Sequence, residues 1–142
     1  MSRGLAEFGF NTFSMPVRGL GGGTFHARHE PELLGFPEAS PEYQAAMKAY
    51  LGAIDAHLRE KGWLDEAFVY WFDEPDSKDY EFVMNGFRKL KQWAPGLRRM
   101  LTEQVEVALI GGPNLWCPVS SAYNHERATV RRQAGDHFWW YV

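Results

Sequence analysis

The chain is poor in cysteine, in long apolar runs and in excess positive charge. Of its 142 residues a single one, Cys117, is a cysteine, which excludes an internal disulfide framework and a cysteine-based zinc site. No run of about 18 apolar residues occurs, so the sequence predicts no transmembrane helix. With 15 Lys and Arg against 18 Asp and Glu, the net charge of −3 argues against a nucleic-acid-binding surface and a polybasic membrane anchor.

Aromatic side chains are the residues in excess. Six Trp, six Tyr and ten Phe make up 15% of the chain, whereas hydrophobic residues (45%) and charged residues (23%) are close to globular averages. The length predicts one domain. An aromatic excess in an acidic globular chain is typical of a carbohydrate site or another ring-stacking site, and a dense core explains it as well.

Hydrophobic periodicity predicts strands that alternate with helices. Strands are expected at residues 8–13, 67–72, 99–103, 115–119 and 138–142, and helices at 41–61, 77–93 and 125–134. The expected N-caps are Ser40, Asp76 and Asn124. Residues 16–39 show no clear period, and a loop of this length is usually functional or disordered. The run at 67–72 is continuously apolar, which is typical of a strand buried on both faces.

This alternation predicts an α/β fold with a parallel sheet covered by helices. The spacing of the strands matches that of a (β/α)8 barrel of about 250 residues. A doubly wound sheet has the same local pattern, but the glycine-rich turn that usually follows its first strand is missing here. We therefore expect a partial TIM-type barrel of about five consecutive strands with intervening helices. Because the sequence stops within the apolar run 138–142, we also expect the chain to be a piece of a longer protein.

The most informative polar residues are Asp73 and Glu74, which directly follow the apolar strand at 67–72. In α/β barrels the active site lies at the carboxyl ends of the strands. Two adjacent carboxylates at the end of an apolar strand repel each other and lose hydration, which favours a protonated acid at neutral pH. The position predicts acid–base catalysis, although a turn with a solvated Glu74 would explain it equally well.

The sequence around this pair resembles that of a known enzyme family. The segment Tyr70-Trp71-Phe72-Asp73-Glu74-Pro75 resembles the Tyr-x-x-Asp-Glu-Pro signature of glycoside hydrolase family 123, in the branch also catalogued as domain of unknown function 4091. Further segments similar to that branch follow in order along nearly the whole chain, at residues 19–25, 60–64, 94–97, 101–104, 115–118 and 138–141.

The resemblance implies a retaining β-N-acetylhexosaminidase that acts on β-N-acetylgalactosaminides by substrate-assisted catalysis. The 2-acetamido oxygen of the sugar would attack the anomeric carbon, Glu74 would act as general acid and then base, and Asp73 would hold the acetamido N–H. No cofactor is implied. Family members carry a β-sandwich ahead of a (β/α)8 catalytic domain, so residues 1–142 would be a partial barrel without the sandwich, the first strands and the last strand.

Other candidates for substrate binding depend on position alone. Trp116 and one of Trp139 or Trp140, of which we take Trp140, could stack on a sugar. Asn11, His26 and Glu103 could reach its polar groups. Tyr123 could polarise the acetamido oxygen, as a tyrosine does in similar substrate-assisted enzymes. Core packing or a solvated turn explains each of these equally well or better. His26, His29 and Glu30 lack an evident further ligand, so we expect no metal. The run at 21–23 lacks the ending of a phosphate-binding loop and predicts a flexible or close-packed turn.

Three functions remain open at this stage. The chain could be part of a hexosaminidase, a non-catalytic carbohydrate-binding relative, or a structural piece completed by another chain. The expected partner is an N-acetylhexosamine-containing glycan rather than nucleic acid or membrane. The open edges of a partial barrel also predict self-association, and an isolated chain that is marginally stable or inactive. Residues 1–4 show no signal-peptide pattern, and the resemblance suggests a bacterial protein without fixing its location.

Overall fold

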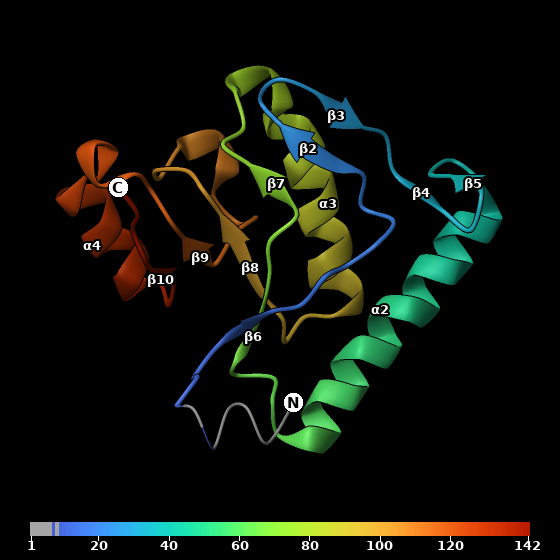
Figure 1. Cartoon of the computed structure of the whole chain (residues 1–142). Coiled ribbons are helices and arrows are strands. Elements are labelled where there is room, and N and C mark those ends of the chain that lie inside the picture. The colour runs from blue at the N-terminus through green and yellow to red at the C-terminus, as the bar shows by residue number, and fades with distance from the viewer. Residues whose placement is uncertain (1–6, 8) are drawn as a thin grey trace.

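Five parallel strands form the main sheet of the computed structural model, which describes residue 7 and residues 9–142 (Figure 1). In sheet order they are β1 (Phe13–Ser14), β6 (Ala67–Val69), β8 (Arg98–Leu101), β9 (Leu115–Trp116) and β10 (His137–Phe138). Each strand pairs in parallel with the next one in this order, so the order in the sheet follows the order in the chain. The expected α/β fold, with the strand arrangement of a partial (β/α)8 barrel, is confirmed. The beginning of the predicted first strand, Phe8, lies outside the described residues.

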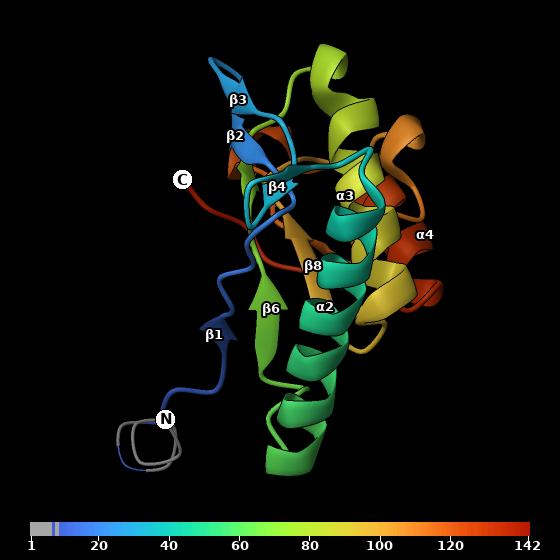
Figure 2. The same cartoon turned by 90° about the vertical axis from the view of Figure 1, so that its right-hand side faces the viewer.

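Three helices lie on one side of this sheet (Figure 2). They are α2 (Pro41–Lys61), α3 (Tyr80–Trp93), which follows a 3-10 turn at Ser77–Asp79, and α4 (His125–Gln133). Ser40 caps α2 as expected, because its Oγ accepts a hydrogen bond from the Tyr43 N–H at 3.2 Å, and Asn124 caps α4 in the same way. Asp76 precedes the 3-10 turn, but its side chain makes no capping bond, so that expectation is wrong. None of the helices in the described part is long and apolar enough to cross a membrane.

Alternate residues of each strand point to opposite faces of the sheet. One face, called here the helix face, packs Ala67, Val69, Leu101, Trp116 and Phe138 into the main core with α2 and α3. The opposite face, called here the inner face, carries a second cluster that contains Phe68, Tyr70, Met100, Leu115, Cys117, Trp139 and Tyr141. This inner face corresponds to the interior of a barrel. The expectation of a strand buried on both faces is met on the helix face, where Ala67 and Val69 are fully buried, whereas Phe68 on the inner face is only half-buried.

The predicted strand at 67–72 is interrupted after β6. Its second part is a separate strand, β7 (Phe72–Asp73), which pairs in parallel with β2 (Gly22–Thr24) instead of continuing the main sheet. Residues 16–39 are therefore not a structureless loop. They hold the hairpin of β2 and β3 (Arg28–His29), and a second hairpin of β4 (Glu32–Leu33) and β5 (Phe36–Pro37). Strands this short, and rich in glycine, leave no hydrophobic period in the sequence.

The glycines of β2 allow its backbone to lie directly against its neighbours. A Cβ atom on Gly23, whose φ is 147°, would stand 2.2 Å from the Ala27 carbonyl oxygen. A Cβ atom on Gly21, at φ 73°, would stand 2.3 Å from the carbonyl oxygen of His29. Neither position has room for a side chain, and the φ angles favour glycine. The run at 21–23 is therefore closely packed, but Gly22 and Gly23 belong to strand β2, so the expectation of a turn is wrong.

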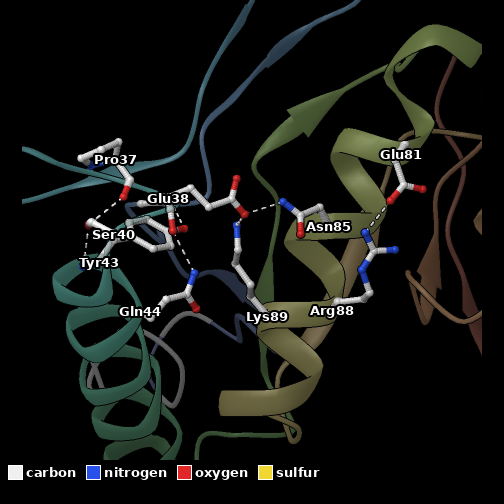
Figure 3. A network of polar contacts seen from close by, with 10 residues as sticks. Pro37, Glu38, Ser40, Tyr43, Gln44, Glu81, Asn85, Arg88 and Lys89 are labelled. Atoms are coloured by element: carbon white, nitrogen blue, oxygen red, sulfur yellow. Dashed lines mark hydrogen bonds and ion pairs between the residues drawn. The ribbon is translucent and has the colours of Figure 1, made fainter.

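A polar network joins the β5–α2 connection to α3 (Figure 3). Lys89 is only 7% exposed on α3, and its ammonium group forms an ion pair with Glu38 and lies 5.2 Å from the centre of the Tyr43 ring. The Asn85 amide donates a second hydrogen bond to Glu38 Oε1 at 2.5 Å. Burial alone would raise the pKa of Glu38, but these two donors and the charges of Lys89 and Arg88 bring it below its ordinary value. The network therefore holds an ionised Glu38.

Candidate active site

Asp73 ends β7, and Glu74 follows it with an unusual backbone. Glu74 has a φ of 43°, in the left-handed region that residues other than glycine rarely adopt. Its N–H donates a hydrogen bond of 2.8 Å to the hydroxyl oxygen of Thr102, which follows β8. Backbone conformations of this kind cost about 1–3 kcal/mol and cluster at functional sites. The fold thus holds the two carboxylates at the carboxyl end of the sheet by contacts between neighbouring strands.

Asp73 is held from two sides. The Tyr70 hydroxyl donates to Asp73 Oδ1 at 2.5 Å, and the Thr102 hydroxyl donates to the same oxygen at 3.0 Å. Burial, together with the bond to Asp73, raises the pKa of Tyr70 to about 12, so this phenol keeps its proton at neutral pH. Since both bonds use Oδ1, Oδ2 is the oxygen that remains for a further donor among the described contacts.

Glu74 is exposed and lines a hollow of about 350 Å³. The walls come from the β2–β3 hairpin and from the segments after β7, β8, β9 and β10. They include Phe25, Asp76, Glu103, Gln104, Val119 and Tyr141. The Tyr141 hydroxyl donates a hydrogen bond to Glu74 Oε1. Burial raises the pKa of Glu103, and so do the charges of Glu106, Glu74 and Asp76. The hydrogen bond that Glu103 accepts from the Gln104 N–H lowers this pKa, but the net shift is upward. The hollow therefore combines the exposed carboxyl group of Glu74 with Glu103, whose pKa is raised, and the fixed carboxylate of Asp73 is adjacent to Glu74 in the chain.

The sequence and the fold are both similar to those of known proteins. The sequence matches the family described as glycoside hydrolase 123, catalytic domain, over residues 25–142. The chain belongs to glycoside hydrolase family 123. Comparison with curated proteins gives no match.

One solved structure of family 123 is similar in fold. It is a glycoside hydrolase from Clostridium perfringens, studied for the details of glycolipid glycan hydrolysis, and it aligns with a TM-score of 0.51 and 16% sequence identity. The alignment covers 80% of this chain and 21% of that one, so the chain spans about a fifth of the length of this relative. At this identity the likeness shows the fold, and the chemistry of the family 123 domain has to be argued from its own residues.

Within this family 123 domain, Glu74 and Glu103 line the hollow, and Asp73 directly precedes Glu74 at the end of β7 without being one of the lining residues. His26 lines a neighbouring hollow of about 290 Å³ between the β2–β3 hairpin and the start of α3, together with Arg28, Lys78 and Asp79. The two hollows share Phe25. His26 is therefore next to the candidate active site rather than within it.

Two aromatic candidates lie on the helix face or at its margin. Trp116 is fully buried in the main core, and its Nε1 donates to Asp136 Oδ2 at 2.8 Å, so its ring has no face free for a sugar. Trp140 is 62% exposed, but it lines a separate hollow with Tyr123 and Arg132 that shares no lining residue with the hollow at Glu74. Trp140 lies away from the hollow at Glu74 because side chains alternate between the two faces of a β-strand. Phe138 and Trp140 therefore point to one face, and Trp139 and Tyr141 point to the other.

Tyr123 and Asn11 are also away from the acid pair. The Tyr123 ring lies 6.4 Å from the Phe138 ring and 6.3 Å from the Trp140 ring, centre to centre, which places it beside the helix face. Asn11 precedes β1, and because β1 is parallel to β6 it lies at the amino ends of the strands, opposite the hollow. The sequence interpretation missed Thr102, which bonds both acids, and Tyr141, which bonds Glu74. Tyr141 is one position from the tryptophan that was chosen.

The histidines of the hairpin form no metal centre in this structure. Among the residues that the structure describes, no group of three or more His, Cys, Asp or Glu side chains is arranged to hold a metal ion. The His29 side chain is exposed on β3, and Glu30 pairs with Arg28 at 3.6 Å.

Proposed function

We propose that this family 123 domain carries the catalytic acids of a retaining β-N-acetylhexosaminidase of the N-acetylgalactosaminide type. The observation that supports the proposal is the different environment of two adjacent carboxylates. Asp73 is fixed by two hydroxyl donors, whereas Glu74 is exposed in the hollow. A fixed anion suits the orientation of a substrate group, and an exposed carboxyl group suits proton transfer.

In the first step of the proposed reaction, the 2-acetamido oxygen of the bound sugar attacks the anomeric carbon while the bond to the leaving oxygen breaks. Glu74 gives its proton to that oxygen, and an oxazolinium ion forms. Asp73, through Oδ2, accepts a hydrogen bond from the acetamido N–H and stabilises the positive charge that develops there. In the second step Glu74, now a carboxylate, takes a proton from water, which attacks the anomeric carbon and reopens the ring with net retention.

Two further residues are assigned to substrate binding. Glu103 lines the same hollow, where its carboxyl group can accept a hydrogen bond from a sugar hydroxyl. His26 lies in the neighbouring hollow, where it would meet the part of the glycan beyond the cleaved bond. The same proposal takes residues 1–142 as part of a larger catalytic barrel. The alignment covers only 21% of the solved relative, which supports this part of the proposal. In that barrel the hollow would be more enclosed than in the chain alone.

The test is thermal unfolding of the chain with N-acetylgalactosamine-thiazoline, a stable mimic of the oxazolinium ion. A ligand at 100 times its dissociation constant adds about 2.7 kcal/mol to the free energy of unfolding. Asp73→Asn should weaken binding by about 10-fold to 100-fold, since a hydrogen bond to a charged group is worth about 1.5–3 kcal/mol. Asp65→Asn is the matched control, because Asp65 is exposed in the turn before β6.

The outcomes separate the proposal from its alternatives. A shift that Asp73→Asn reduces to about half or less and that Asp65→Asn keeps supports the substrate-assisted site. A cooperative transition with no shift in the wild-type chain contradicts the proposed site in this chain. A shift that Asp73→Asn leaves intact contradicts the role of Asp73 and favours a carbohydrate-binding surface elsewhere on the domain.

A further inference from the structure

Tyr141 contacts the acid pair from the edge of the main sheet formed by β10. It follows β10, whereas Glu74 follows β7, and 67 residues separate them in the sequence. Its hydroxyl nevertheless donates to Glu74 Oε1. The contact joins two segments of the wall of the hollow that are distant in the sequence. The reaction proposed above assigns no role to Tyr141.

The backbone of Tyr141 is fixed on both sides. Its N–H donates to the Pro118 carbonyl oxygen at 3.2 Å, and its own carbonyl oxygen accepts from the Ser120 N–H at 2.7 Å, so it forms a bridge beside Val119. The side chain belongs to the inner-face cluster that also contains Trp139. The direction of the phenol is therefore set by the sheet and by packing.

The groups around Glu74 are mostly acidic. Asp73 and Asp76 lie on its own segment, with Asp76 paired to Lys78 at 3.6 Å, and Glu103 lies on the segment after β8. Tyr70 and Tyr141 are the titratable hydroxyls nearby. Burial, and then the contact with Glu74, raise the pKa of Tyr141, so the phenol keeps its proton and donates at neutral pH. The phenol of Tyr141 is therefore a neutral donor to Glu74 Oε1 in surroundings that are otherwise mostly acidic.

We propose that Tyr141 is a positioning residue that stabilises the carboxylate form of Glu74 and directs its other oxygen at the substrate. This inference rests on the proposed function of Glu74. Since Oε1 is engaged by Tyr141, Oε2 is the oxygen that faces the leaving group. Tyr141 thereby assists the second step, in which Glu74 must be a base, and it sets the pH at which the acid form is lost.

The test compares Tyr141→Phe with wild type in the protein that carries this chain. The substrate is a β-linked N-acetylgalactosaminyl disaccharide, whose sugar leaving group needs a proton. Loss of the hydrogen bond destabilises the carboxylate, so the alkaline limb of kcat/KM should move to higher pH by about one unit. Replacement of Tyr141 by a fluorinated tyrosine, whose phenol is a stronger donor, should move the limb to lower pH. Tyr123→Phe is the matched control and should leave the profile unchanged.

Glu74→Gln in the same series distinguishes failure of the proposed function of Glu74 from failure of the inference about Tyr141. It should lower kcat by at least about 100-fold if Glu74 is the acid and base. If Glu74→Gln remains active, the proposed function itself is wrong. If Glu74→Gln is inactive while Tyr141→Phe and the fluorinated variant keep the wild-type pH profile, the inference about Tyr141 is overturned. Both Tyr141 variants keep the aromatic ring that packs on the inner face, so their folding can be checked by thermal unfolding.

Discussion

Gly86, on α3, is expected to exclude any larger residue. A Cβ atom there would stand 2.4 Å from Cζ2 and 2.5 Å from Cη2 of Trp71. The Trp71 ring lies within 6.0 Å of the rings of Phe72, Phe82 and Phe87, centre to centre, so it cannot turn away without moving them. Gly52, on α2, is a natural control, because the nearest atom to its Cβ position is 4.0 Å away.

The two substitutions to alanine should have opposite signs. Alanine is favoured over glycine inside a helix by about 1 kcal/mol, so Gly52→Ala should raise the free energy of unfolding by about that amount. Overpacking costs about 1–3 kcal/mol, and the aromatic neighbours of Trp71 place Gly86→Ala toward the upper end. After the helix gain, the net loss for Gly86→Ala is about 2 kcal/mol.

Urea and thermal unfolding of both variants measure this difference. A gap of about 3 kcal/mol corresponds to roughly 10 °C in Tm for a domain of this size. Trp71 lies two residues before Asp73, so Gly86→Ala should also weaken thiazoline binding, whereas Gly52→Ala should not. If Gly86→Ala proves as stabilising as Gly52→Ala, the ring of Trp71 does not occupy the space in question, and the packing described for this segment is wrong.

Two other perturbations test the contacts around α2. Ser40→Ala should lower the free energy of unfolding by about 1 kcal/mol, and Ser40→Gly should lower it by only a few tenths, because glycine tolerates the cap position. Urea unfolding of both variants measures these losses, and equal losses would contradict a capping role for Ser40. The pKa of Glu38 is lowered in the folded state, so the stability that it contributes is present above its ordinary pKa of 4.5 and is lost as the pH falls through the folded value. The difference in stability between wild type and Glu38→Gln should therefore shrink as the pH falls below about 4.5, and a difference that stays constant down to pH 2 would contradict the Lys89–Glu38 pairing.

Local features of the fold could be predicted from the sequence. The caps at Ser40 and Asn124 depend on neighbouring residues alone, and the order of the sheet follows from the alternation of strands and helices. Asp73 and Glu74 were found for the same reason, since the acid pair is contiguous and follows an apolar strand.

The features that were missed depend on which side a residue faces. Residues 138–141 are four aromatic residues in a row, so hydrophobicity does not reveal which of them point to the helix face. Trp140 was taken as a sugar-binding residue, whereas Tyr141 is the residue that contacts Glu74. Trp116 was also taken as a sugar-binding residue, although its position in β9 directs it into the core. The contact between Tyr141 and Glu74 spans 67 residues, a distance at which a single sequence carries no pairing signal.

The β2–β3 hairpin is attached to β7 through the backbone of β2, and its glycines leave no space for side chains. Its attachment is thus independent of the residues at its tip, which include Phe25 and His26 and border both hollows. A directed-evolution library should therefore keep residues 21–23 and vary the tip, where new side chains could change the accepted glycan while the acid pair stays in place. The same separation would allow relatives with one catalytic chemistry to diverge toward different substrates.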